Sequence, residues 1–340
     1  MPKSLNKCRT LIISGVAVFA FQLCSSQPVQ AYQDQQGDGS RQIIAEEFTR
    51  SRPEKGRPSS TGPSSASSAK QGGGQAPSTR RRPRYRRMTT TGSSTSSNTS
   101  GGAIPTNTTS PLPASSAKVG VTIWRLRPGQ AADQGTRLLV QGDEGELVPE
   151  RVSTGTEMRV RDRVRLSIEA PREGYLYVVD RELYADGSMG EPYLIFPTTR
   201  TRGGDNRVRP GKLIDIPAQD DRPNYFTLIP TPGRDDQVGE VLSFIVTTEP
   251  LENFEVSSKP QKLSAAQVQN WEKMWGGRTE QYDLEGGAGQ TWTKEESEAA
   301  KTGEGSRILT QEEPTPQTIY LVEGKNNKGL LITVPLRYKK

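Results

Sequence analysis

A run of apolar residues between Gly174 and Thr198 constrains the fold of this chain more than any other segment. It reads GYLYVVDRELYADGSMGEPYLIFPT, with two apolar stretches on either side of Asp186-Gly187. Side chains along an extended strand point to alternate faces, and Asp-Gly supplies the positive φ that a hairpin turn needs. The segment therefore predicts a β-hairpin at the centre of a mainly β fold, an antiparallel β-sandwich.

Short apolar stretches separated by turn residues continue this pattern. Residues 164–169 alternate strictly between apolar and polar side chains, which is typical of a strand with one face in solvent. Such spacing favours a sandwich over alternating βαβ units. The expected strands are residues 119–127, 136–141, 157–160, 163–169, 174–183, 192–197, 211–216, 224–229, 240–248, 318–323 and 329–338, with a C-terminal hairpin over residues 318–338.

One helix interrupts the strands, over residues 264–275. Ser264 can cap its start, and Trp271 and Trp275 share one face, which favours packing against the sandwich over an aromatic ligand platform. Thr293 predicts the start of a second, polar helix. We expect one β-sandwich domain over residues 117–340.

The N-terminal residues 1–31 combine basic residues, a short apolar run and a cleavage-site pattern of small residues that ends at Ala31. These are the parts of a secretory signal peptide, and the run is too short to span a membrane. A lipoprotein signal with Cys24 is the competing interpretation, which the bulky Leu23 disfavours. We expect an exported protein, in the periplasm, at the cell surface or outside the cell, without an integral membrane segment in the mature chain.

Residues 32–116 are rich in Ser, Thr, Gly, Pro and Arg and carry a net charge of +7, against −4 for residues 117–340. Such a composition predicts a disordered tether, because it offers little apolar surface to bury. Ile43, Ile44 and Phe48 have near-helical spacing. They predict either a short docking helix or, as we prefer, a transient helical turn.

A basic cluster surrounds Tyr85 within the predicted tether. It could bind an anionic polymer by releasing counterions, or it could be a solubilising block of charge. Its members are Arg80, Arg81, Arg82, Arg84, Arg86 and Arg87.

The chain contains no histidine, and its two cysteines lie within the predicted signal peptide. These absences exclude Ser-His-Asp and Cys-His catalysis, zinc sites of the His or Cys type, and disulfides in the mature chain. An enzyme would have to use carboxylate, Lys, Tyr or Ser-Lys chemistry. We therefore expect no enzyme activity, no catalytic residue set and no cofactor.

Two small sets of residues are candidates for binding. Oxygen atoms of Asp180, Glu182 and Asp186 could hold Ca²⁺, but the spacing of these residues is not that of an EF-hand. We prefer to interpret the segment as a solvated turn, and we expect no bound metal. Exposed aromatic and arginine side chains are the expected contact surface for a partner. They are Tyr184, Tyr193, Arg207 and Arg209.

The order of several motifs resembles a bacterial family, domain of unknown function 4384, over roughly residues 119–251. They are the GYLYV strand at residue 174, the Asp186-Gly187 turn, IFP at residues 195–197, N-x-V-x-x-G at residues 206–211, and Ile216-Pro217, followed by Tyr225-Phe226 and residues 239–242. The resemblance implies a β-rich, non-catalytic module, often beside peptidase, kinase or envelope domains. It implies no site residues.

Together these observations predict an exported, non-catalytic interaction module that binds an envelope protein or glycan. A carboxylate-based hydrolase acting on envelope polymers and a passive spacer are the alternatives.

Overall fold

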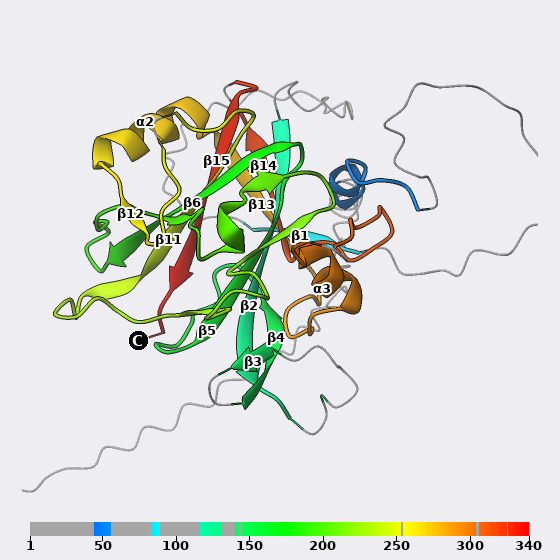
Figure 1. The fold of residues 1–340 in the computed structure, drawn as a ribbon, viewed down its shortest axis with the longest axis horizontal. Coiled ribbons are helices and arrows are strands. Elements are labelled where there is room, and N and C mark those ends of the chain that lie inside the picture. The colour runs from blue at the N-terminus through cyan, green and yellow to red at the C-terminus, as the bar shows by residue number, and fades with distance from the viewer. Residues whose placement is uncertain are drawn as a thin grey trace, which may run out of the picture. The chain divides into compact units, whose positions relative to one another are not determined.

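Two antiparallel sheets face each other in the folded part of the chain (Figure 1). The computed structural model describes residues 44–55, 83–88, 116–130, 133, 140–142, 145–252, 254–303, 306–324 and 326–339. The predicted mainly β, antiparallel sandwich is confirmed. The predicted signal peptide lies outside the described residues.

Among the described residues, the larger sheet has nine strands. β1, β13, β14, β2 and β5 lie next to one another in that order, and β9 and β10 pair with β5. β4 pairs with the C-terminal part of β2, and β3 pairs with β4. Their bounds are β1 (Tyr85–Met88), β2 (Ser116–Pro128), β3 (Val140–Gly142), β4 (Gly145–Val152), β5 (Arg163–Glu169), β9 (Leu213–Ile216), β10 (Phe226–Thr227), β13 (Arg278–Leu284) and β14 (Thr318–Glu323).

The smaller sheet, within the same described ranges, has the order β12, β7, β6, β11 and β15, with β8 paired to β6. Its strands are β6 (Gly174–Tyr184), β7 (Tyr193–Phe196), β8 (Arg207–Val208), β11 (Gln237–Thr247), β12 (Gln261–Lys262) and β15 (Gly329–Arg337). The helical elements are residues 44–49, η2 (Arg202–Gly204), α2 (Ala265–Trp275) and α3 (Lys294–Ala300). None of the helices in the described ranges combines the length and the apolar composition that crossing a bilayer requires.

Apolar side chains from the inner faces of both sheets form the main core. Leu176 and Val178 of β6 lie on the inner face, and the intervening Tyr177 and Val179 lie on the outer face. All four are buried. Because side chains alternate along a strand, a run that is apolar at every position needs cover on both faces.

Helix α2 supplies the cover on the outer face of the smaller sheet. Ser264 caps its start, since its hydroxyl accepts a hydrogen bond from the Gln267 N–H at 3.1 Å. Val268 and Trp271 are buried against this sheet, and Trp275 stacks on Trp271 with ring centroids 6.2 Å apart. The predicted packed helix is confirmed, and Trp271 serves packing.

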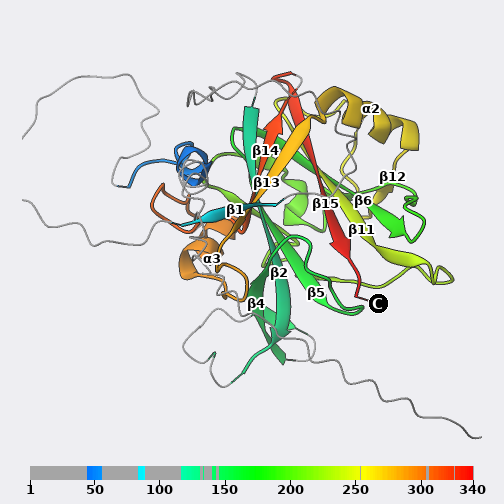
Figure 2. The same cartoon turned by 180° about the vertical axis from the view of Figure 1, so that it is seen from behind.

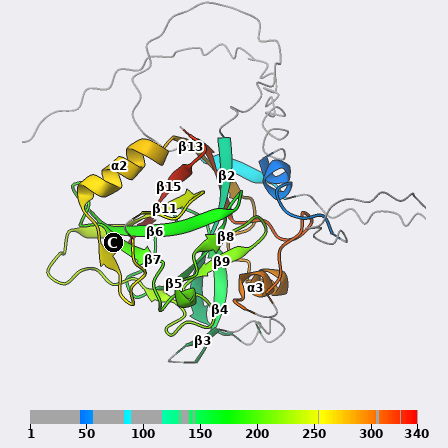
Figure 3. The ribbon, with the colours of Figure 1, turned by 45° about the horizontal axis from the view of Figure 1, so that its top comes forward.

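Helix α3 lies on the other side of the sandwich, against the larger sheet (Figure 3). Thr293 and Glu296 form a capping box at its start, with N–H to oxygen distances of 3.2 and 3.0 Å. Ala299 and Ala300 are buried in the same cluster as Trp124. The predicted second helix is present, but one side of it is buried, so it is not a polar helix throughout.

The predicted C-terminal hairpin over residues 318–338 is wrong. Both strands form, but β14 pairs with β13 and β2 in the larger sheet, whereas β15 pairs with β11 in the smaller sheet. The short connection after Glu323 therefore passes from one sheet to the other. Both strands are apolar on nearly every position, so each can lie in the interior of its own sheet.

The prediction of a disordered tether over residues 32–116 is wrong for two segments. The helical residues 44–49 bury Ile44 and Phe48, and β1 buries Tyr85 completely, in one apolar cluster with Ile319 and Leu321 of β14. Figure 2 shows both segments, in blue and cyan, at the edge of the larger sheet where β1 pairs with β13. The docking helix is thus formed, and it docks on the sandwich of its own chain.

A buried ion pair holds the first of these segments. Arg52 donates from Nε and Nη2 to the two carboxylate oxygens of Glu169, at 2.7 and 2.6 Å, and neither side chain is more than 1% exposed. The guanidinium also donates to the carbonyls of Thr310, Glu313 and Pro314. Five donors of one arginine therefore meet five acceptors, an arrangement that leaves no N–H of the group without a partner.

Replacing Arg52 by Met should cost about 3–5 kcal/mol of unfolding free energy, because it leaves the Glu169 carboxylate buried without its cation. Urea unfolding followed by circular dichroism measures the loss. Adding Glu169→Gln should restore part of it, because the double variant buries no charge. Arg87→Met, which breaks an exposed pair with Glu280, is the control and should change stability little. An equal loss in both single variants would contradict this role of the buried pair.

Candidate functional site

A cleft opens between the two sheets at the side where β10 lies in the larger sheet and β7 and β12 lie in the smaller sheet. It has a volume of about 350 Å³ and is lined by both sheets and by the loops that follow β7 and β9. We call it the inter-sheet cleft. Its walls are mainly apolar, formed by side chains such as Leu166, Ile195, Phe226, Leu228, Leu242 and Leu336.

A β-bulge directs one wall residue into the inter-sheet cleft. Val178 pairs with Phe196 and the next residue, Val179, pairs with Leu194, so Ile195 is the extra residue in β7. Ile195 is half-buried and lines the cleft, while Leu194 lies under α2. The bulge therefore gives β7 apolar contacts with the cleft and with α2 in consecutive positions.

Acidic side chains lie at one end of the inter-sheet cleft, which we call the acidic end. Along β6 the inner face continues from Val178 to Asp180 and Glu182, and Glu240 of β11 lies opposite Glu182. Asp180 and Glu240 both line the cleft, as diagonal neighbours roughly 7 Å apart in the sheet. Tyr338 donates a hydrogen bond to Glu240 at 2.5 Å. The apolar inner face thus ends in three carboxyl groups.

Burial and the negative charges of the neighbouring Glu240 and Glu182 together raise the pKa of Asp180 to about 8, against Arg181, which lowers it. Its Oδ1 is shielded from solvent and has no hydrogen-bond partner among the described residues. Burial also raises the pKa of Glu240, against the hydrogen bond from Tyr338, which lowers it. The shift favours the protonated form of Asp180, which lowers the negative charge at the acidic end of the cleft.

The rim of the inter-sheet cleft is cationic. Arg200 and Arg222 line it and are exposed. Arg222 donates to the carbonyls of Gln219 and Asp221, and Arg200 has no hydrogen bond or ion pair within the described part of the chain. The Asp221 carboxylate accepts the backbone N–H groups of Ala218 and Arg202. No carboxylate of the described residues therefore neutralises either guanidinium directly.

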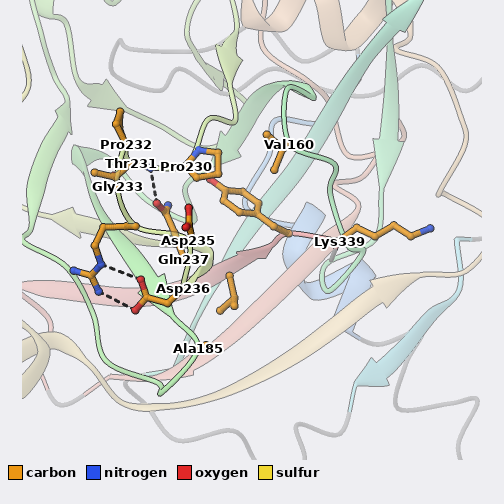
Figure 4. A pocket seen from close by; sticks show the side chains of 13 residues that line it. Val160, Ala185, Pro230, Thr231, Pro232, Gly233, Asp235, Asp236, Gln237 and Lys339 are labelled. Carbon is orange, nitrogen blue, oxygen red and sulfur yellow. Dashed lines mark hydrogen bonds and ion pairs between the residues drawn. The ribbon is translucent and has the colours of Figure 1, made fainter.

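A second hollow, of about 630 Å³, lies beside the loop 230–238 (Figure 4). There, Arg234 donates two hydrogen bonds to Asp236, at 2.9 and 3.0 Å. Its guanidinium carbon also lies over the Tyr184 ring, 3.5 Å from the ring centroid. The Gln237 side chain accepts a hydrogen bond from the Thr231 N–H. These groups satisfy one another. The hollow is larger than the inter-sheet cleft, but Arg234, Asp236 and Gln237 in its wall are engaged within the loop itself, so we assign the candidate site to the cleft.

The structure separates the residues that the sequence offered as calcium ligands. Asp180 and Glu182 lie together on the inner face, but Asp186 lies at the hairpin turn, where it accepts the Ser188 N–H at 2.8 Å. Among the described residues no set of three acidic, histidine or cysteine side chains is arranged to hold a metal ion. Asp186 therefore has a structural role in the hairpin turn, where the neighbouring Gly187 has a φ of 84°.

The predicted contact surface of Tyr184, Tyr193, Arg207 and Arg209 is not one surface. Tyr184 is buried beneath Arg234, so its prediction as an exposed contact is wrong. Arg207 pairs with Tyr175 at the opposite end of β6, roughly 30 Å along the strand from Tyr184. Tyr193 and Arg209 are exposed, and Arg207 forms an ion pair with Asp205 at 2.9 Å.

The described members of the basic cluster lie along the edge of the larger sheet. Arg84, Arg86 and Arg87 are exposed, and Arg87 forms an ion pair with Glu280 at 2.7 Å. Arg80, Arg81 and Arg82 lie outside the described residues. Binding of an anionic polymer by this cluster remains a prediction.

Sequence reasoning missed Glu240 and Arg222. Glu240 has a sequence signal, because it precedes the alternating apolar residues of β11 just as Asp180 and Glu182 follow those of β6. Arg200 belongs to an arginine-rich loop around Gly203-Gly204 that the sequence also allows as an anion-binding loop, but its place beside Arg222 has no sequence signal, because the two loops meet only in the fold.

Comparison of the chain with protein-family models, with curated proteins and with solved structures finds no match. The resemblance to domain of unknown function 4384 therefore stays a prediction from the motifs alone.

The free energy of unfolding should fall as the pH rises from about 4 to about 8, in part because of Asp180. Its pKa is raised from 3.8 to about 8 in the folded state, so the folded protein holds a proton that the unfolded chain has lost. Asp180→Asn should remove part of this fall, measured as urea midpoints at about pH 5 and about pH 8.5.

Asp186→Asn is the matched control. The pKa of Asp186 is lowered by hydrogen bonds from Ser188, so this substitution should leave the fall in stability above pH 5 in place. An Asp180→Asn variant with an undiminished fall would show that Asp180 is ionised in the folded protein at neutral pH.

Proposed function

We propose that this chain is an exported, non-catalytic interaction module whose ligand enters the inter-sheet cleft. The observation that carries the proposal is an apolar cavity that reaches between the sheets and has unneutralised arginines at its rim. Close packing normally fills the space between two sheets, so an open apolar cavity of this size is a candidate binding site. The predicted signal peptide supports export to the cell envelope.

The apolar walls favour an apolar group of an envelope component over the polar surface of a glycan. The residues that surround the cleft also favour binding over catalysis. They include no histidine or cysteine, because the chain has no histidine and its cysteines precede the folded part. The resemblance to a non-catalytic family agrees with this proposal.

Filling the inter-sheet cleft should abolish specific capture of envelope material. Ile195→Trp places a larger side chain at the bulge, where the wall is only half-buried. Mature protein on beads would be incubated with a mild-detergent extract of the envelope, and retained proteins and small molecules would be identified by mass spectrometry. At least one component should be retained by the unmodified chain and lost with Ile195→Trp.

Ile229→Trp is the control, because Ile229 is 62% exposed and does not line the cleft. It should retain that component. If both variants retained the same envelope components, the ligand site would not be the inter-sheet cleft.

One observation favours a second function, a carboxylate-based hydrolase. Asp180 and Glu240 both line the acidic end of the cleft, and the raised pKa of Asp180 favours the protonated form that a general acid needs. Glu240 would then act as the base. If so, Asp180→Asn and Glu240→Gln should each slow the release of soluble fragments from isolated envelope polymers by roughly 100-fold. Equal release by the unmodified chain and both variants would rule out this activity.

A further inference from the structure

The size and the walls of the inter-sheet cleft fit a linear apolar group. Phe226 of the larger sheet and Ile195 of the smaller sheet are half-buried walls of the cleft, and the buried side chains of Leu166, Leu242 and Leu336, with Leu228 just after β10, lie behind them. A methylene group occupies about the volume of a water molecule, roughly 30 Å³, so a cavity of about 350 Å³ takes a chain of about ten carbon atoms.

The rim fits a carboxylate. Arg200 and Arg222 come from separate loops and both line the entrance. Their nearest acidic neighbour on the rim, Asp221, has its carboxylate engaged by two backbone N–H groups. A guanidinium recognises a carboxylate through paired N–H donors, and the rim offers two such groups. Charge complementarity therefore favours an anion at the entrance and disfavours a cation.

The acidic end accepts an apolar chain more readily while Asp180 keeps its proton. A neutral carboxyl group costs far less than a carboxylate beside buried methylene groups. The charged groups that shift the pKa of Asp180 are Glu240 on β11 and Glu182 and Arg181 on its own strand. Tyr338 donates a hydrogen bond to Glu240, and Arg200, Asp221 and Arg222 line the same cleft. Loss of the Asp180 proton would place a negative charge beside the alkyl chain.

We propose that the inter-sheet cleft binds a fatty acid of medium chain length, with its carboxylate at Arg200 and Arg222 and its alkyl chain between the sheets. The inference rests on the proposed binding function of the cleft. It narrows the ligand to a monocarboxylate with an unbranched apolar chain.

Isothermal titration calorimetry of the mature protein with hexanoate, octanoate, decanoate and dodecanoate tests the chain. Affinity should rise roughly fourfold for each added methylene, because each buries a similar apolar area, up to about ten carbons. Beyond that length the gain should stop. Affinity for decanoate should also fall as the pH rises above about 8, and Asp180→Asn should remove this fall.

Substitutions at the rim test the head group. The double variant Arg200→Gln, Arg222→Gln should weaken decanoate at least tenfold while leaving decanol, which has the same chain without the charge, unchanged. Arg207→Gln, an exposed arginine outside the cleft, is the matched control and should bind decanoate normally. Ile195→Trp should abolish binding of both compounds.

The outcomes separate this inference from the proposed function. No binding of any fatty acid, with capture from the extract still lost in Ile195→Trp, would overturn the fatty-acid proposal and leave the cleft as the binding site. Binding of a peptide that ends in an apolar residue, without binding of decanoate, would do the same. Decanoate binding that survives Ile195→Trp would place the fatty acid elsewhere and overturn the proposal.

Discussion

The ion pair between Arg52 and Glu169 joins parts of the chain that are far apart in sequence. Glu169 ends β5 and also accepts the Gly211 N–H at 3.1 Å, and Arg52 reaches three carbonyls in residues 310–314. A buried charge is tolerated only when its partner and its hydrogen bonds are all present. The N-terminal segment, the central strand, the turn before β9 and the loop before β14 must therefore be in place together. The folded unit consequently begins well before residue 117.

The inner face of the smaller sheet explains why the sandwich is filled at one end and open at the other. Leu176, Val178 and Phe244 are fully buried where the sheets are in contact. Beyond them the same face presents Asp180, Glu182 and Glu240, which cannot interdigitate with apolar side chains at the density of a core. The inter-sheet cleft lies where this change of chemistry occurs. The packed core and the proposed binding site thus lie on successive parts of the same strands.

Local patterns in the sequence predict the elements whose side chains alternate strongly and whose ends are capped. The hairpin of β6 and β7 and helix α2 belong to this class, because the information that fixes them lies within a few residues. β4 was missed because it contains Pro149, which normally argues against a paired strand. The Pro149 carbonyl still accepts a hydrogen bond from the Trp292 N–H at 3.2 Å, so β4 is also paired at this residue.

Long-range pairings were beyond local reasoning. β13 is mostly polar, and Tyr282 is its main apolar anchor, so its strand state depends on β1 and β14 on either side. The exchange of sheets between β14 and β15 likewise depends on partners elsewhere in the chain. The same reason applies to Arg52 and to the rim of the cleft, since neither has a local signal.

The position of β1 changes how far the basic cluster can act. Tyr85 is fully buried and donates a hydrogen bond to the Pro316 carbonyl at 2.5 Å, so the chain is fixed at this point. Arg80 lies five residues away, a span of at most about 18 Å when fully extended. An anionic polymer that engaged these arginines would be held alongside the edge of the larger sheet. The described members of the basic cluster, Arg84, Arg86 and Arg87, are therefore held at the edge of the larger sheet by the buried Tyr85 between them, so an anion that binds them is brought to one defined place on the folded unit.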